Sequence, residues 1–171
     1  RTVSRLFRPS LEDPWNGMAE PNDLYFRSER GFELAPADPV LSEVGLTRAV
    51  VAGDFDRQGQ LEVLIVNVET PSILVTPPKS DARELFVEAV DQAGHPVLHA
   101  LIFCQTGERI QRRRQGISDG YASAQPPEVH FGLAASQAPA ELTVQWPDGT
   151  QDVFQVEPRT TRFQAQKGSG R

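Results

Sequence analysis

The chain contains a single cysteine, Cys104, which excludes an intrachain disulfide and any metal site built from several cysteines. It also lacks an apolar run near the ~20 residues that a membrane-spanning helix needs, so we expect no transmembrane segment. Acidic residues outnumber basic ones, 23 to 17, and the net charge of −6 argues against a nucleic-acid partner. Hydrophobic residues make up 39% of the chain, which is enough to build a packed core.

Long helices have little room, because 14 prolines and 13 glycines are spread along the 171 residues. Short segments alternate apolar and polar residues instead, as strands with one buried face do. Before the proline pair at 77–78 we expect short strands at 24–26, 31–34, 49–52, 61–66 and 72–76. After it we expect strands at 84–90, 97–104, 109–114, 128–133, 141–146, 151–156 and 161–165. The sequence therefore predicts an all-β protein.

The proline pair marks the clearest boundary, because consecutive prolines hold the chain extended and donate no hydrogen bond to a sheet. We expect four parts along the chain. They are an extended arm over 1–21, one small antiparallel sheet over 22–77, a β-sandwich or barrel over 81–167, and a flexible tail over 168–171.

Two stretches resemble known families. Val129–Leu133 (VHFGL), followed by Ala140–Gly149 (AELTVQWPDG) and Val153–Phe154, resembles the signature of the ASPIC/UnbV domain. Upstream, Ala52–Val63 (AGDFDRQGQLEV) is similar to the loop of the FG-GAP/VCBS repeat, the integrin-type blade of a β-propeller. The resemblance implies a four-stranded propeller blade followed by an ASPIC/UnbV-like β domain, in a secreted or envelope-associated protein.

The same resemblance implies a calcium loop, because the repeat binds Ca²⁺ with the pattern D-x-D-x-D-G-x-x-D. Its ligand positions fall on Asp54, Asp56, Gln58, Gln60 and Glu62. Gln58 and Glu62 depart from the acidic pattern, and Arg57 adds a neighbouring positive charge, so we expect weakened affinity. Two alternatives stay open: a degenerate calcium site, or a calcium-free hairpin that keeps the turn at Gly59.

Four residues are candidates for binding a partner. They are Trp15, which lies in an irregular segment, and the basic residues Arg109, Arg112 and Arg114. On a strand, Arg112 and Arg114 share one face. They form either a solvated edge strand protected from pairing by its charge, or a site for an anionic polysaccharide, a lipid head group or an acidic protein.

No residues group into a catalytic set. Ser118 lies in a G-x-S-x-G match, but its flanks do not indicate the strand-to-helix turn that this motif needs. His95 and His99 lie four residues apart on an extended segment, which spans ~13 Å and is too long for a shared metal. We expect His130 to pack or face solvent and Cys104 to be buried. The sequence predicts no enzyme.

A single propeller-type repeat cannot bury its apolar faces alone. We therefore expect a non-catalytic binding or structural protein, extracellular or periplasmic. It would be an accessory subunit that docks on another protein chain or on the missing propeller blades. The alternatives are a carbohydrate- or matrix-binding module, assisted by calcium or not, and a fragment of a longer β-propeller protein. We expect no cofactor other than Ca²⁺.

Overall fold

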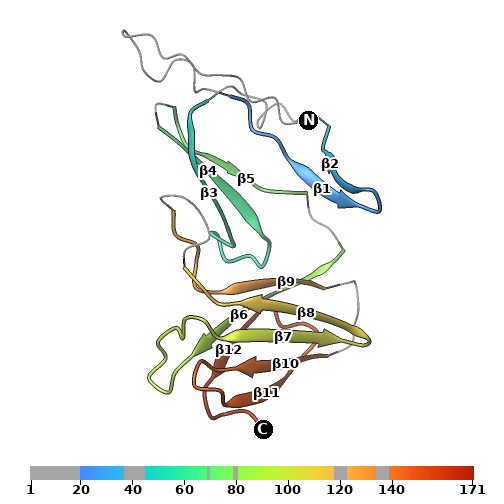
Figure 1. Cartoon of the computed structure of the whole chain (residues 1–171), viewed down its shortest axis with the longest axis vertical. Helices are drawn as coiled ribbons and strands as arrows, with labels where there is room; N and C mark the ends of the chain where they lie inside the picture. Colours follow the sequence, from blue (N-terminus) through green and yellow to red (C-terminus); the bar gives the residue numbers. More distant parts are fainter. Residues whose placement is uncertain (1–19, 37–44, 69, 79–80, 118–122, 134–138) are drawn as a thin grey trace. The chain divides into compact units, whose positions relative to one another are not determined.

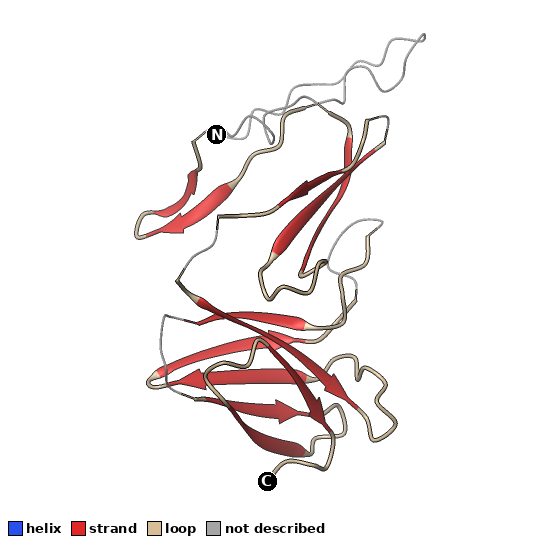
Figure 2. Cartoon of the chain, turned by 180° about the vertical axis from the view of Figure 1, so that it is seen from behind, coloured by secondary structure: helices blue, strands red, loops and turns tan. Residues whose placement is uncertain are grey.

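The computed structural model describes residues 20–36, 45–68, 70–78, 81–117, 123–133 and 139–171. Within these ranges every regular element is a strand or an isolated bridge, as Figure 2 shows, and this confirms the all-β prediction. No helix in the described part of the chain is long and apolar enough to cross a membrane.

The strands lie close to the segments in which residues alternate (Figure 1). The first five are β1 (Tyr25–Ser28), β2 (Gly31–Leu34), β3 (Thr47–Gly53), β4 (Glu62–Asn67) and β5 (Ile73–Val75). The remaining strands are β6 (Arg83–Val90), β7 (Leu101–Thr106), β8 (Arg109–Arg114), β9 (Val129–Leu133), β10 (Ala140–Gln145), β11 (Gln151–Val156) and β12 (Arg162–Gln166).

The described strands form four sheets. Their orders are β1-β2, β3-β4-β5, β12-β6-β9 and β11-β10-β7-β8. The segment 22–77, for which we expected one sheet, is thus divided between two sheets, because alternation identifies strands without choosing their partners. The chain forms two compact units, one of Arg1–Val50 with Ile65–Ile73 and one of Val51–Leu64 with Leu74–Arg171.

The second unit is a β-sandwich with an apolar core between its two sheets. Every second residue of β10 is buried, and so are Leu85, Val87 and Ala89 on β6. The core also takes in residues of β7, β9, β11 and β12, among them Ile102, Phe131, Phe154 and Ala165. A fully buried Leu, Ile, Val or Phe side chain in this core contributes about 1.5–3 kcal/mol before conformational entropy is subtracted.

The β12-β6-β9 sheet pairs its strands in a way that the alternation of apolar and polar residues does not predict. β6 lies at its centre, antiparallel to β9 and parallel to β12. In this register Phe86 lies opposite both Arg162 and His130. Since Leu85 and Val87 face the core, this row lies on the outer face of the sheet.

The C-terminal residues close the edge of the sandwich. The Asp152 carboxylate accepts hydrogen bonds from Trp146 Nε1 (2.7 Å) and the Gly168 amide (2.8 Å). Arg171 exchanges two backbone hydrogen bonds with Val153. The residues 168–171, for which we expected a flexible tail, therefore contribute to the fold of the second unit.

Candidate functional site

The loop between β3 and β4 holds the group of carboxylates that the sequence singled out. Ligand atoms of Asp54, Asp56 and Glu62 lie within 4.8 Å of one another. Asp54 and Glu62 are buried, whereas Asp56 is exposed. The structure thus brings together three of the five predicted ligand residues.

The oxygens of the two buried carboxylates already accept several hydrogen bonds. Asp54 Oδ2 accepts the Gly59 amide at 2.9 Å. Glu62 Oε2 accepts the amides of Phe55 (3.1 Å) and Asp56 (3.4 Å), and its Oε1 accepts the Thr76 hydroxyl at 3.0 Å. These hydrogen bonds hold the start of the loop against Glu62. They also stabilise its buried carboxylate, which would be unfavourable without such donors.

Arg162 on β12 supplies a positive charge to this loop. Its Nη2 donates to Asp54 Oδ2 at 2.8 Å and to the Asp54 carbonyl at 3.3 Å, and its Nη1 forms an ion pair with Glu128. The guanidinium also lies 5.1 Å from the centre of the Phe86 ring. Burial lowers the pKa of Arg162, but Glu128 and Asp54 outweigh this effect and raise it overall.

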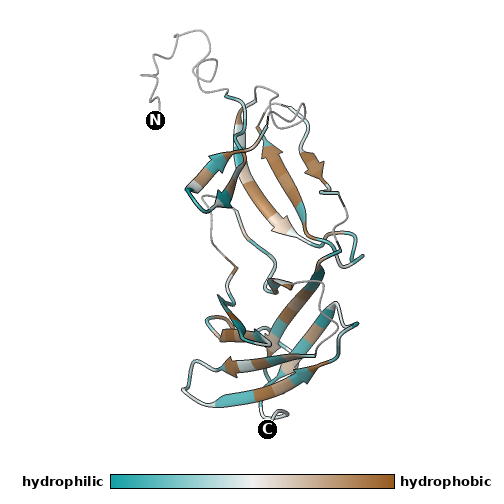
Figure 3. Ribbon diagram, turned by 90° about the vertical axis from the view of Figure 1, so that its right-hand side faces the viewer, coloured by the Kyte–Doolittle hydropathy of each residue, from teal (hydrophilic) through white to brown (hydrophobic). Residues whose placement is uncertain are grey.

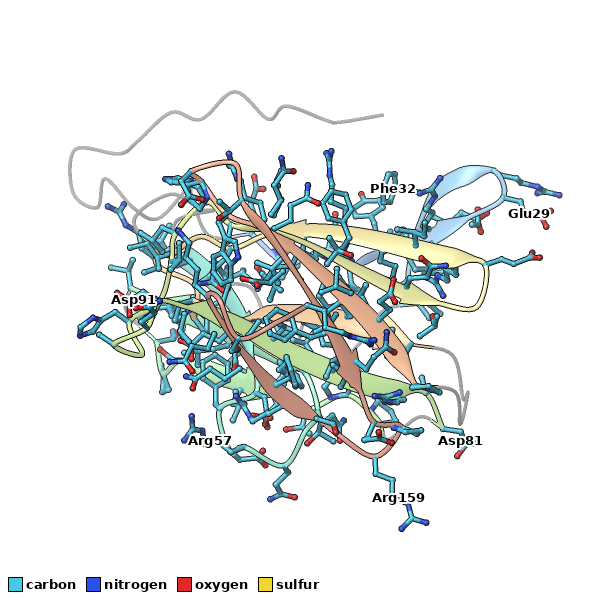
Figure 4. All side chains as sticks on the ribbon, turned by 90° about the horizontal axis from the view of Figure 1, so that it is seen from below. Glu29, Phe32, Arg57, Asp81, Asp91 and Arg159 are labelled. Carbon is cyan, nitrogen blue, oxygen red and sulfur yellow. The ribbon has the colours of Figure 1, made fainter. Side chains whose placement is uncertain are left out.

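Two residues of the loop have a left-handed backbone. Gly59 has φ of +80°, and a Cβ at this position would lie 3.2 Å from the Thr161 side chain. A glycine is therefore needed both for the conformation and for the close approach to the residue before β12. Arg57 has φ of +60°, and its exposed side chain points away from the ribbon (Figure 4).

Backbone amides at both ends of the loop also donate hydrogen bonds to side chains elsewhere in the second unit. The Ala52 amide donates to Gln125 Oε1 at 3.0 Å, and the Leu61 amide donates to Glu84 Oε2 at 2.8 Å. Beside the loop lies a pocket of ≈560 Å³ over the outer face of β6 and β12. Phe55, Phe86, Glu88, Pro126, Glu128 and Arg162 are among its lining residues.

Several of the predicted calcium ligands in this loop already form hydrogen bonds with protein groups. Ca²⁺ takes 6–8 oxygens, and both oxygens of Glu62 as well as Asp54 Oδ2 are engaged by protein donors. Gln60 donates its amide to the Pro77 carbonyl, and the Gln58 side chain is exposed. Within the described part of the chain, Asp54 Oδ1 is buried without a hydrogen-bond partner, so this oxygen and the Asp56 carboxylate remain available as metal ligands.

The basic cluster lies on β8, which is an edge strand of its four-stranded sheet. Arg109, Arg112 and Arg114 are exposed. Arg112 and Arg114 lie opposite Phe103 and Leu101 of β7, on the face turned away from the core. Arg109 lies opposite Thr106 and belongs by alternation to the other face.

The remaining candidates do not form a site in the described part of the chain. Trp15 and Ser118 lie outside the described residues. His95 is exposed and lies 3.5 Å from Asp91, and His99 is exposed with φ of +67°. His130 is half-buried, with its ring centre 5.0 Å from that of Phe86 and its Nε2 3.3 Å from Glu84. Cys104 is a buried free thiol.

Sequence reasoning missed the residues that complete the loop. Arg162 on β12 contacts Asp54 from 108 residues away along the chain, and Glu128, the residue before β9, pairs with Arg162. Neither residue belongs to a recognisable motif, so no local signal indicates this contact. A long-range pairing of this kind follows from the register of β12 on β6.

A comparison with protein families matches the part of the chain that forms most of the sandwich. Residues 91–171 match the ASPIC and UnbV family model. This confirms the ASPIC/UnbV resemblance for these residues. The ASPIC/UnbV match begins just after β6, although β6 is the central strand of a sandwich sheet, so the folded unit extends beyond the match. Comparison with curated proteins gives no match.

Proposed function

We propose that this chain is a non-catalytic, extracellular or envelope-associated binding protein that acts as an accessory subunit. In this proposal it docks on another protein chain through the β1–β2 hairpin, as a propeller-type blade packs against its neighbour. The observation that carries the proposal is the exposed apolar face of this hairpin, described next.

The β1–β2 hairpin pairs its apolar side chains on one face. Tyr25 lies opposite Leu34, and Arg27 lies opposite Phe32. The exposed fractions are 52% for Tyr25, 55% for Leu34 and 77% for Phe32. Figure 3 shows apolar and polar residues side by side on these strands, and Figure 4 marks Phe32 on the hairpin. The opposite face carries Phe26, which is 47% exposed.

The low stability and the apolar composition of this hairpin support the proposal that a protein partner covers it. A two-stranded hairpin by itself is at best marginally stable in water. Covering Phe32, Tyr25 and Leu34 would remove their exposed apolar area from water, which is favourable by about 25 cal/mol for each Å² before the costs of association. Aromatic side chains are also common anchors of protein interfaces. We infer that a protein surface covers this face in the working assembly.

Three observations support a non-catalytic role. Cys104 is buried, His95 is exposed beside Asp91, and His130 contacts both Phe86 and Glu84. None of these arrangements brings a nucleophile within reach of a base.

The test is the native mass of the protein isolated from its source, measured by size exclusion with light scattering. We expect a defined particle heavier than 18.9 kDa that contains a second protein. The substitution Phe32→Ser should release the chain as a monomer. Phe26→Ser, on the opposite face of the same hairpin, is the matched control and should leave the particle intact. A monomeric wild-type chain, or equal dissociation by both variants, would contradict the proposal.

A second candidate function is binding of an anionic polysaccharide on the outer face of β7 and β8. Arg112 and Arg114 share this face with Phe103 and Leu101, so cationic groups lie beside an apolar surface that can pack on a sugar ring. We expect Arg112→Glu to abolish binding to immobilised uronic-acid polysaccharides at low salt. Arg109→Glu, on the other face of the same strand, should retain it. Absence of wild-type binding would remove this candidate.

A further inference from the structure

We propose that Arg162 is the built-in cation of the Asp54–Glu62 loop, so that the loop holds its turn without a divalent metal ion. The resemblance of the loop implies calcium, whereas the arrangement of its donors assigns the neutralising charge to a side chain of β12. The inference is independent of the docking function proposed above.

The first argument is the position of the guanidinium. The Asp54 side chain is fully buried, and a buried carboxylate without a counter-charge is strongly unfavourable. Arg162 contacts the side chain and the carbonyl of this same residue, at 2.8 and 3.3 Å. Through its other terminal nitrogen it also pairs with Glu128. One terminal nitrogen therefore binds two oxygens of Asp54 while the other binds Glu128, so the positive charge is held beside the loop from a fixed point on the sheet.

The second argument is the state of the remaining carboxylates. Glu62 uses both oxygens to accept protein hydrogen bonds, from two backbone amides and from the Thr76 hydroxyl. Asp56 Oδ1 accepts the Gln58 amide at 2.9 Å, and the residue is exposed. The loop is thus closed by its own donors, which leaves no need for a metal ion to draw the carboxylates together.

The third argument concerns Asp54 Oδ1. Asp54 Oδ1 is buried and accepts no hydrogen bond from any residue that the structure describes. While Arg162 is present, its positive charge stabilises the whole carboxylate. Without Arg162, the Asp54 carboxylate would keep the Gly59 amide as its donor among the described residues, and the three carboxylates that lie within 4.8 Å of one another would lose this positive charge. That arrangement favours capture of a divalent cation.

The experiment compares wild type with Arg162→Gln by thermal unfolding, with a chelator and with about 5 mM CaCl₂, a concentration that suits weak extracellular calcium sites. We expect the wild-type Tm to be the same in both conditions. Arg162→Gln should lower the Tm in chelator by about 6–12 °C, because it breaks a buried ion pair. Calcium should then restore about 2–4 °C in this variant.

The matched control is Arg159→Gln, which removes an exposed arginine from the turn just before β12 and is labelled in Figure 4. It should leave the Tm unchanged and insensitive to calcium. In the double variant Asp54→Asn with Arg162→Gln, both charges are lost, and the calcium response should disappear.

Two outcomes would overturn the proposal. One is a wild-type chain that calcium stabilises as much as it stabilises Arg162→Gln. The other is an Arg162→Gln variant that responds to calcium no more than wild type does. Calorimetric titration of the wild type keeps the proposal testable if Arg162→Gln does not fold. Saturable heat with millimolar calcium, lost in Asp54→Ala, would show that the loop binds calcium despite Arg162.

Discussion

The buried side chain of Gln115 leads to the sharpest prediction about stability. Gln115 follows β8 directly and is 0% exposed. Its Oε1 accepts the Ala89 amide at 2.7 Å, and its Nε2 donates to the carbonyls of Ala89 (2.8 Å) and Val97 (3.1 Å). The side chain thus pairs with the end of β6 as the backbone of a neighbouring strand would.

The substitution Gln115→Leu keeps a similar volume and removes all three hydrogen bonds. The Ala89 carbonyl keeps the Val97 amide as a donor, but the Ala89 amide and the Val97 carbonyl lose these contacts. At about 1 kcal/mol for each bond, and more for a buried amide left unpaired, we expect a loss of about 3 kcal/mol. Domains of this kind have a free energy of unfolding of about 5–15 kcal/mol, so the loss is a large fraction of the total.

Urea unfolding followed by tryptophan fluorescence measures this loss, since Trp146 is buried in the same unit. Gln105→Leu is the matched control, because Gln105 is exposed and donates only to the nearby Gly107 carbonyl at 3.0 Å. We expect the control to lie within about 0.5 kcal/mol of wild type. If Gln115→Leu lies equally close to wild type, the three hydrogen bonds do not stabilise the unit as argued.

Two further predictions concern titratable groups. Burial lowers the pKa of His130 below its ordinary 6.5, against the opposing effect of Glu84, so the unfolded chain binds a proton more readily than the folded one. The free energy of unfolding should therefore rise with pH up to about 6.5, and His130→Gln should reduce this slope in urea midpoints measured across the range; an unchanged slope would contradict it. Burial also raises the pKa of the Cys104 thiol, so it should react with a thiol reagent in denaturant but not in buffer.

The alternation of apolar and polar residues was sufficient to locate the strands. Leu142 and Val144 on β10 show why, because strict alternation leaves one face of a strand for the core and one for solvent. The ASPIC/UnbV signature could also be recognised from the sequence, because most of its residues lie close together in β9, β10 and the turn that follows. The carboxylates Asp54, Asp56 and Glu62 could also be selected from the sequence, because one loop carries all of them.

The sequence by itself determined the all-β class, the positions of the strands and the acidic loop, because short-range alternation and spacing encode each of these. Only the tertiary structure decided which strands pair, including the parallel contact of β12 with β6. That register brings Arg162 to Asp54 across 108 residues of sequence. A loop that resembles a calcium site in its own residues therefore receives a positive charge from a distant part of the chain. The physical reason is that charge balance in a buried site depends on every group within a few ångströms, and distance along the sequence does not measure that separation.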